Sequence, residues 1–339
     1  MSFSRNKILN LFLLILFLGN VGITNAQTSQ DPPNIVFILL DDLRWDAMGF
    51  TNKYPFLETP NIDKLRKEGV LFKNSFCTHS LCAPSRATFL TGTFSQVHGV
   101  NSNQEGREFN PDKTPSFAQI LQKNGYKTAF IGKWHMGTTN TPRKGFDYWC
   151  SFTGQGNYYG NNLNINGEIK RNEGYITDEL NKYALSFIKK NGKSQPFCLY
   201  LSHKAVHQPF TPPKRDKNLY QDDLVPKPGS WEDDMAGKPA WQRLQPTLDQ
   251  RRRLRTKDLD EIKVINNRNP GEWPAKKGKG QQKDYLRCIS AVDDGLGKIY
   301  EQLKKEGILD NTIIVFSSDN GFFHGEHGKG DKRLAYNES

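Results

Sequence analysis

The sequence predicts an α/β protein in which a mainly parallel β-sheet is covered by helices. Short apolar runs of strand length, of which residues 34–40 are the first, alternate with stretches that repeat apolar residues at helical spacing. A nearly continuous apolar run is typical of a strand buried on both faces. Hydrophobic residues make up 36% and aromatic residues 12% of the 339 positions, which excludes a disordered chain because such chains cannot bury enough apolar surface.

The predicted elements follow one another as strands and helices. Thr59 and Pro60 predict the start of a helix that ends at Gly69, because a threonine cap and a first-turn proline favour helix starts and glycine favours helix ends. Thr114 and Pro115 predict the start of a second helix. The run 71–77 alternates only weakly. The remaining predicted elements are strands at 127–131, 197–201 and 312–316 and helices at 176–189 and 284–305.

The first 26 residues are predicted to be a signal peptide. Arg5 and Lys7 give a positive start, residues 8–21 are mostly apolar, and small residues precede a cleavage site after Ala26. The apolar run is short for a membrane span, although a single N-terminal anchor is the alternative, and no later stretch approaches a span. We therefore expect an exported protein, periplasmic or secreted, whose mature part 27–339 has no membrane span.

The chain is basic, with a formal net charge of +11 and a pI near 9.3. This charge predicts an anionic partner without choosing its class. Much of the excess lies in residues 211–283, which carry 17 basic and 11 acidic residues and interrupt the strand–helix alternation. We interpret this segment as a surface insertion in the domain. Either a solvated loop or charged helix, or a surface that contacts a polyanion, would explain it.

Five cysteines are present, and an odd number leaves at least one unpaired if all pairs are intramolecular. They are Cys77, Cys82, Cys150, Cys198 and Cys288. No C-x-x-C pair or Cys/His cluster has the spacing of a zinc site. Cys198 and Cys288 resemble small core residues in their apolar surroundings.

Oxygen-bearing side chains follow the first and the last predicted strands. Asp41 and Asp42 follow the first, and Asp319 and Asn320 follow the last. Each pair alone has a simpler explanation. Asp41 and Asp42 could cap a helix or form a salt bridge, and Asp319 and Asn320 could belong to a turn. Because open α/β sheets place ligands at the carboxyl ends of their strands, the four side chains together predict a site for Ca²⁺ or Mg²⁺, which prefer oxygen ligands.

Cys82 stands at a predicted helix start. Pro84 lies in the first turn, and Gly92 marks the helix end, so the free amides and the dipole of this helix favour an anion beside Cys82. Taken only as a thiol, Cys82 is either a nucleophile with a lowered pKa or a buried structural cysteine.

The run Cys82-Ala83-Pro84-Ser85-Arg86, continued by Thr88 to Gly92, resembles the modification motif of the type I, formylglycine-dependent sulfatases. The chain as a whole resembles bacterial glycan sulfatases. The resemblance implies an alkaline-phosphatase-like fold and a Cys82 oxidised to formylglycine by a maturation enzyme. The hydrated aldehyde would then serve as the nucleophile, and a second hydroxyl would allow release of sulfate.

The resemblance also assigns roles to other positions. Gly132-Lys133-Trp134-His135 resembles the second motif of the family, although a lysine and a histidine on one loop are common by themselves. His207 matches the histidine of an H-x-P motif, and Lys332 matches a sulfate-binding lysine. The implied catalytic residues are Cys82, Arg86, Lys133, His135, His207 and Lys332. The implied substrate-binding residues are Lys133, His207, Lys332 and His203. For His203 two roles are open: it either faces the glycan or caps the preceding strand. The implied metal ligands, for one Ca²⁺ or Mg²⁺, are Asp41, Asp42, Cys82, Asp319 and Asn320.

His324 and His327 lack a metal-ligand spacing and are interpreted as loop residues near the substrate. The chain departs from the family pattern at Asn337, where a glutamate commonly stands, and at its last residue, Ser339. Family members usually continue into a smaller C-terminal subdomain, so we expect that subdomain to be missing here. A sheet edge and apolar surface would then be uncovered.

The expected function is hydrolysis of sulfate esters on a sulfated polysaccharide or oligosaccharide, including units of the glucosamine-6-sulfate type. Lys133, Lys332 and Arg86 would surround the sulfate, His207 with Lys332 would protonate the leaving alcohol, and His135 would accept a proton on release. A metal-dependent phosphatase or phosphodiesterase of the same superfamily, with two zinc ions and a serine or threonine nucleophile, is the first alternative. An inactive polyanion-binding remnant is the second. A nucleic-acid partner is not expected.

Overall fold

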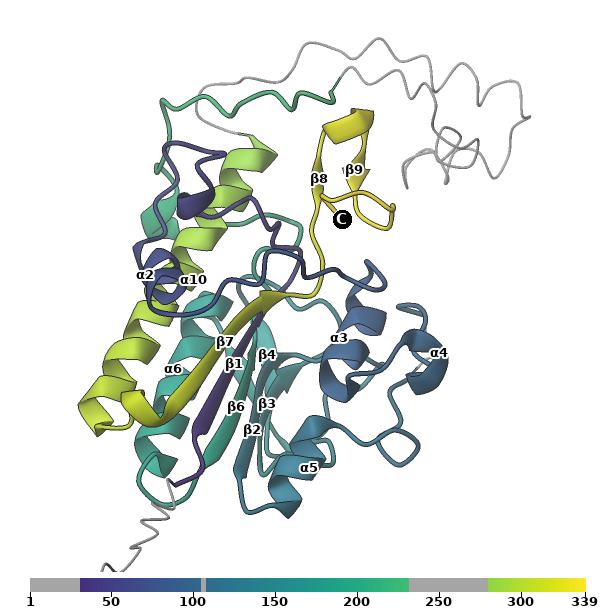
Figure 1. The fold of residues 1–339 in the computed structure, drawn as a ribbon, viewed down its shortest axis with the longest axis vertical. Coiled ribbons are helices and arrows are strands. Elements are labelled where there is room, and N and C mark those ends of the chain that lie inside the picture. Colours follow the sequence, from purple (N-terminus) through teal and green to yellow (C-terminus); the bar gives the residue numbers. More distant parts are fainter. Residues whose placement is uncertain (1–30, 105–107, 232–279) are drawn as a thin grey trace, which may run out of the picture. The chain divides into compact units, whose positions relative to one another are not determined.

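A seven-stranded sheet lies at the centre of the unit Pro33–Ser339 (Figure 1). The computed structural model describes residues 31–104, 108–231 and 280–339. The predicted signal peptide, 1–26, lies outside the described residues, as does most of the predicted basic insertion, of which 232–279 are not described. In the described part of the chain, no helix is both long and apolar enough to cross a membrane.

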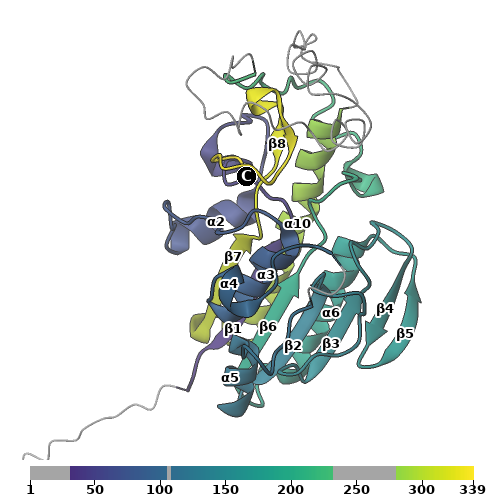
Figure 2. The same cartoon turned by 90° about the vertical axis from the view of Figure 1, so that its right-hand side faces the viewer.

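The sheet is mainly parallel, as predicted, with strand order β5-β4-β3-β2-β6-β1-β7. Five strands run parallel to one another: β1 (Asn34–Leu40), β2 (Lys127–Lys133), β3 (Tyr148–Phe152), β6 (Phe197–Ser202) and β7 (Thr312–Ser318). The strands β4 (Asn161–Ile165) and β5 (Glu168–Asn172) extend it as an antiparallel hairpin, visible at one edge in Figure 2.

The sequence analysis missed β3 and this hairpin. The hairpin is hard to find because β5 is exposed and polar, so it has no apolar alternation. The turn itself carries a local signal. Asn166 and Gly167 both have positive φ, 52° and 102°, which is the conformation that Asn-Gly adopts in tight hairpins.

Helices cover both faces of the sheet (Figures 1 and 2). One face carries α2 (Pro60–Glu68), α6 (Ile176–Asn191) and α10 (Gln281–Glu306), and the other carries α3 (Cys82–Thr91), α4 (Ser95–His98) and α5 (Phe117–Lys123). Short 3₁₀ turns lie at Gly49–Thr51, Lys214–Asp216, Leu309–Asn311 and Glu326–Gly328, and a small hairpin is formed by β8 (Phe323–His324) and β9 (Gly330–Asp331).

One predicted helix starts later than expected. The helix expected from Thr114 begins at Phe117, because Ser116 forms a capping box with Gln119: each side chain accepts a hydrogen bond from the backbone N–H of the other residue. The weakly alternating run 71–77 forms no strand, and it exposes the large apolar side chains Phe72 and Phe76.

The core has a different composition on each face of the sheet. Toward α6 and α10 it is mainly aliphatic, with Leu180 and Ile289 among its buried residues. Toward α3 and α5 it is aromatic, and the rings of Phe130 and Trp149 stack with centroids 4.8 Å apart. Cys198 and Cys288 are buried, as predicted.

Parallel pairing brings the carboxyl ends of β1, β2, β6 and β7 to one edge of the sheet. Leu40 of β1 pairs with Ser318 of β7, so the residues that follow the two strands, Asp41 and Asp319, become neighbours. The amide of Asp319 donates to the Leu40 carbonyl at 3.0 Å. This register places the polar residues that follow each strand around a common centre.

Gly132 lies where β2 approaches β6 most closely, and it allows a direct test of this edge. Its φ is +119°, and a Cβ added there would lie 1.8 Å from the Ser202 carbonyl oxygen. We expect Gly132→Ala to lower the free energy of unfolding by about 3 kcal/mol, through strain and overpacking. Gly92→Ala is the matched control, since Gly92 has φ +66° with nothing within 4 Å, and should cost only about 1 kcal/mol. Equal losses in chemical denaturation would contradict the role of the close approach.

Candidate active site

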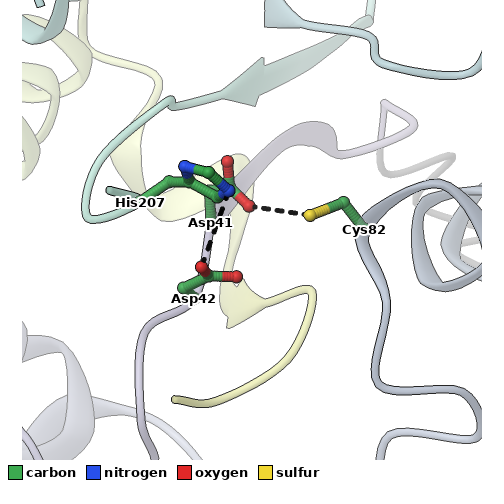
Figure 3. A group of neighbouring side chains, drawn as sticks. All are labelled: Asp41, Asp42, Cys82 and His207. Atoms are coloured by element: carbon green, nitrogen blue, oxygen red, sulfur yellow. Dashed lines mark hydrogen bonds and ion pairs between the residues drawn. The ribbon is translucent and has the colours of Figure 1, made fainter. Parts of the chain in front are cut away.

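Six segments contribute side chains to one buried group at the carboxyl edge of the sheet. They are the residues after β1, the start of α3, the end of β2, the segment after β6, the segment after β7, and Lys332 after β9. Figure 3 shows four of the side chains: the Cys82 thiol points toward the Asp41 carboxylate, and the His207 imidazole lies beside Asp42. The structure thus brings together residues that are up to 290 positions apart in the chain.

The backbone after β1 is fixed from both sides. The Asp41 amide donates to the Ala205 carbonyl at 2.9 Å, and the Val206 amide donates to the Asp41 carbonyl at 2.7 Å. The Asp42 amide donates to Asp319 Oδ1 at 3.1 Å, and Asp42 has a left-handed φ of 65°. This geometry turns both carboxylates away from solvent, where they are buried.

Each buried carboxylate has a buried cation as partner. Lys133 Nζ contacts Asp41 Oδ2, Lys332 Nζ contacts Asp42 Oδ1, and Arg86 Nε donates to Asp319 Oδ2 at 2.9 Å. Buried charges are tolerated only when paired in this way.

The pKa values follow from this pairing. Burial raises the pKa of Asp41, but Lys133, His207, Arg86 and Lys332 more than offset it and hold that pKa well below its usual range. Burial and the nearby Asp41 charge raise the pKa of Asp319 to about 7, in spite of Arg86. The two carboxyls therefore differ in how readily they take up a proton.

Cys82 lies at the first position of α3, as its sequence context predicts. Its Sγ is 3.4 Å from Asp41 Oδ1 and 3.1 Å from Lys332 Nζ. Burial, with the Asp41 carboxylate, raises the pKa of the thiol to about 12, and the lysines and helix start do not reverse this. The interpretation of Cys82 as a nucleophile with a lowered pKa is therefore not supported for the thiol.

The histidines occupy three different environments. His207 Nδ1 lies 2.6 Å from the Gln208 carbonyl, which only accepts, so Nδ1 carries a proton and Nε2 faces Asp42 Oδ2 at 3.8 Å. Burial lowers the pKa of His207, and burial and Lys133 lower that of His135 to about 2, so both rings are neutral at pH 7. His203 is 1% exposed and its amide donates to the Leu39 carbonyl, which favours the strand-end role over contact with a glycan.

The donor groups fit a hard divalent cation. Ligand atoms of Asp41, Asp42, Cys82 and His207 lie within 4.8 Å of one another. Asn320 Nδ2 donates to Asp42 Oδ1 at 2.7 Å, and its buried Oδ1 has no hydrogen-bond partner within the described residues. An unpaired amide oxygen beside two carboxylates is the kind of ligand that Ca²⁺ accepts. His207 is thus a further candidate ligand, one that the sequence analysis did not propose.

Several polar residues of the site were missed in the sequence. Arg86 Nη1 donates to Ser202 Oγ at 2.6 Å and to the Lys133 carbonyl at 2.7 Å, and Lys133 Nζ donates to Gln155 Oε1 at 2.5 Å. Lys204 is also buried, with Nζ 5.0 Å from the Tyr158 ring centroid, and burial and Lys133 lower its pKa to about 8. Only Gln155 has a local sequence signal, because it stands between two glycines.

The interpretation of His324 and His327 as loop residues near the substrate was wrong for His324. His324 belongs to β8 and is buried against the ring of Tyr285, with centroids 4.4 Å apart. The neighbouring Glu326 binds Arg44 Nη1 at 2.6 Å, and His327 stacks on Tyr336. These residues anchor the β8–β9 hairpin.

Comparisons with known proteins agree with this geometry. A sequence model of the Sulfatase family matches residues 33–339. An N-acetylglucosamine-6-O-sulfatase of Bacteroides thetaiotaomicron is 34% identical over 97% of this chain, which covers 65% of that protein. An N-acetylgalactosamine-6-sulfatase of Homo sapiens is 27% identical over 87% of this chain, which covers 51% of that protein.

A solved structure, that of a protein in complex with its substrate D-glucosamine-2-N,6-O-disulfate, gives a TM-score of 0.73 at 32% identity and covers 91% of this chain and 69% of that one. These matches confirm the alkaline-phosphatase-like fold that the sequence motifs implied. The chain spans between about half and two thirds of the length of the two curated relatives.

The burial of Cys82 predicts slow alkylation of its thiol. With a pKa of about 12, roughly one thiol in 10,000 is ionised at pH 8, and Cys150, Cys198 and Cys288 have similar values. Burial of its sulfur also raises the pKa of Cys77, but Cys77 is the exposed residue among the five. In protein that carries Cys82 as a thiol, iodoacetamide should therefore label Cys77 first, by peptide mass spectrometry. Protein unfolded in urea, where all five should react, is the control. Labelling of Cys82 as fast as Cys77 in the folded protein would contradict the prediction.

Proposed function

This chain belongs to the sulfatase family, and from that premise we propose that it hydrolyses sulfate esters on glycans. The observation that carries the proposal is the position of Cys82. Its side chain, at the start of a helix, lies between the Asp41 carboxylate and the Lys332 ammonium group. Lys133 is paired with Asp41, and Arg86 with the neighbouring Asp319. A sulfate bound there meets helix amides and three cations.

We propose that Cys82 is converted to formylglycine by a maturation enzyme. The hydrated aldehyde supplies a hydroxyl nucleophile and a second hydroxyl through which sulfate can be released. The raised thiol pKa supports this proposal, because a protonated thiol is a poor nucleophile. The short distances from Cys82 Sγ to Asp41 and Lys332 mean that groups able to accept and donate protons already surround position 82.

The same site would hold Ca²⁺ (or Mg²⁺) through Asp41, Asp42, Asp319, Asn320 and position 82. When bound there, the ion would supply positive charge against the negative charge of the sulfate ester. Asp319 accepts from both the Asp42 amide and Arg86, so it also orients the two groups beside it.

Both histidines are neutral at pH 7, so a neighbouring charge must take part in proton transfer. His207 Nε2 faces the site while Nδ1–H is held by the Gln208 carbonyl, so a neutral His207 has no proton on Nε2. We therefore propose that the leaving alcohol takes its proton from Lys332, or from His207 once a bound sulfate anion favours its protonated form. Burial and Lys133 lower the pKa of His135 to about 2, which makes it a weak base. We propose that it accepts the proton released at position 82 while sulfate is bound, because the anion offsets the charge of Lys133. The two histidines stand on different loops, after β6 and β2.

The proposed substrate is a sulfated polysaccharide or oligosaccharide with glucosamine-6-sulfate units. The 34% identical relative is named an N-acetylglucosamine-6-O-sulfatase, and the solved structure reported above is a complex with a glucosamine disulfate. The basic composition of the chain is consistent with a polyanionic glycan. We also propose that the protein acts outside the cytoplasm, after removal of residues 1–26.

A phosphatase or phosphodiesterase with two zinc ions is less well supported. Its expected serine or threonine nucleophile is absent at position 82. Oxygen donors come from Asp41 and Asp42, and also from the buried Asp319 and Asn320, beside the sulfur of Cys82 and the imidazole of His207. An inactive polyanion-binding protein is also less well supported, because such a protein has no need of buried, paired catalytic groups.

The proposed reaction can be tested on protein coexpressed with a formylglycine-generating enzyme. Peptide mass spectrometry should find an aldehyde in place of the thiol at position 82, and glucosamine 6-sulfate should be desulfated. Cys82→Ala should lower kcat/KM by more than 1,000-fold, in the range for loss of a covalent nucleophile. Ser194→Ala, at an exposed turn between α6 and β6, is the control and should retain activity. Full turnover by protein whose Cys82 is entirely a thiol would refute the proposal.

The metal assignment predicts one calcium ion per chain by elemental analysis. Calcium at 100 times its Kd should raise the free energy of unfolding by about 2.7 kcal/mol, which chelation should remove. Asn320→Ala should reduce this gain, because it removes the unpaired Oδ1. Asn124→Ala, at an exposed helix end, should leave the gain unchanged. Stoichiometric zinc, or an equal calcium effect in both variants, would count against the site.

A further inference from the structure

Gln155 lies on the loop that follows β3, where two glycines determine the path of the backbone. Gly154 and Gly156 have φ values of 61° and 63°, in the left-handed region. A Cβ at Gly156 would lie 2.4 Å from the Phe152 ring, so the loop is held closely against that ring. Because both neighbours have this conformation, the side chain between them is directed back toward the end of β2, where it meets Lys133.

The contact with Lys133 fixes the ammonium group. A lysine ammonium has three N–H donors. One contacts Asp41 Oδ2 and a second donates to Gln155 Oε1 at 2.5 Å. Within the described residues no third acceptor is present, so two acceptors orient Lys133 and leave one N–H for an anion. Asp41 alone would leave the ammonium group free to rotate.

The same contact determines which way the Gln155 amide faces. An ammonium group has no acceptor, so the oxygen of the amide must face Lys133 and the NH₂ group must face away from it. Nε2 is bonded to the same carbon as Oε1, which Lys133 Nζ contacts at 2.5 Å, so Nε2 lies within about 5 Å of the ammonium group. No acceptor for Nε2 is found among the described residues, and Gln155 is only half-buried.

We propose that Gln155 is a positioning and substrate-binding residue of this site. Its Oε1 orients Lys133, and its Nε2 donates a hydrogen bond to the sulfate ester that Lys133 binds. The proposal rests on the proposed function, since it names a further contact to the same sulfate. A neutral donor adds affinity for the anion without adding a charge to a site that already contains Lys133, Lys332 and Arg86.

Two variants separate the roles of the two amide atoms. Gln155→Glu keeps an oxygen acceptor for Lys133 but replaces the donor with an anionic oxygen. Gln155→Met has similar length and removes both polar atoms. Gln155→Glu also adds a negative charge, so Asn157→Asp, at an exposed residue of the same loop, is the charge control. If Gln155 served only to orient Lys133, Gln155→Glu would lose no more sulfate affinity than Asn157→Asp, and only Gln155→Met would be impaired further.

We expect both variants to bind inorganic sulfate at least 10-fold more weakly than the wild type by isothermal titration calorimetry, because a hydrogen bond to a charged group is lost. With glucosamine 6-sulfate, Gln155→Glu should raise KM with little change in kcat, whereas Gln155→Met should raise KM and also lower kcat. Gln122→Met is the matched control at an exposed glutamine of α5 and should resemble the wild type. Unchanged thermal unfolding confirms that the variants are folded.

Wild-type sulfate affinity and KM in Gln155→Glu would overturn the proposal, as would wild-type values in Gln155→Met. The calorimetric comparison does not depend on turnover. Absence of sulfate ester hydrolysis by the wild type would therefore refute the proposed function, while the difference in sulfate binding between wild type and variants would still decide the role of Gln155.

Discussion

Asp41, Asp42 and Asp319 are buried within one hydrogen-bonded group, and ionised carboxylates remain there only because Lys133, Lys332 and Arg86 are buried beside them. Removing one member would leave a buried charge without a partner, which costs more than the pair contributes. The cations come from β2, from the C-terminal hairpin and from α3, so all three elements must dock before the charges are compensated. The site and the fold around it therefore depend on each other.

The parallel sheet makes this convergence possible. Four strands end at the same edge, and the registers Leu39 with Ser202 and Leu40 with Ser318 bring the following residues into contact. Backbone hydrogen bonds continue past the strands, as from the His203 amide to the Leu39 carbonyl. Helices packed on both faces hold the strands in this register and exclude water from the base of the site. The site is therefore built on rigid backbone, with Lys133 and Arg86 further fixed by Gln155 and Ser202.

Electrostatic compensation also separates groups of the same chemical type. The pKa of Asp41 is held well below its usual range, mainly by Lys133, whereas burial raises that of Asp319 to about 7. The thiol of Cys82 is protonated although it adjoins a helix start and a lysine, because burial and Asp41 outweigh them. The side chain at position 82 is thus protonated near neutral pH and a weak nucleophile as it is encoded, which is consistent with a role that requires its conversion to another group.

The sequence by itself determined the alternation of strands and helices, the position of Cys82 at a helix start, and the polar residues that follow β1, β2, β6 and β7, because these depend on local patterns of three to ten residues. It did not predict the antiparallel hairpin, whose polar strand β5 depends on pairing with β4 for its structure. Nor could it predict that Gln155 meets Lys133, that His203 is buried, or that the pKa values of Asp41 and Asp319 are shifted in opposite directions. These properties are set by distances between segments remote in the chain, and only the packed sheet decides those distances.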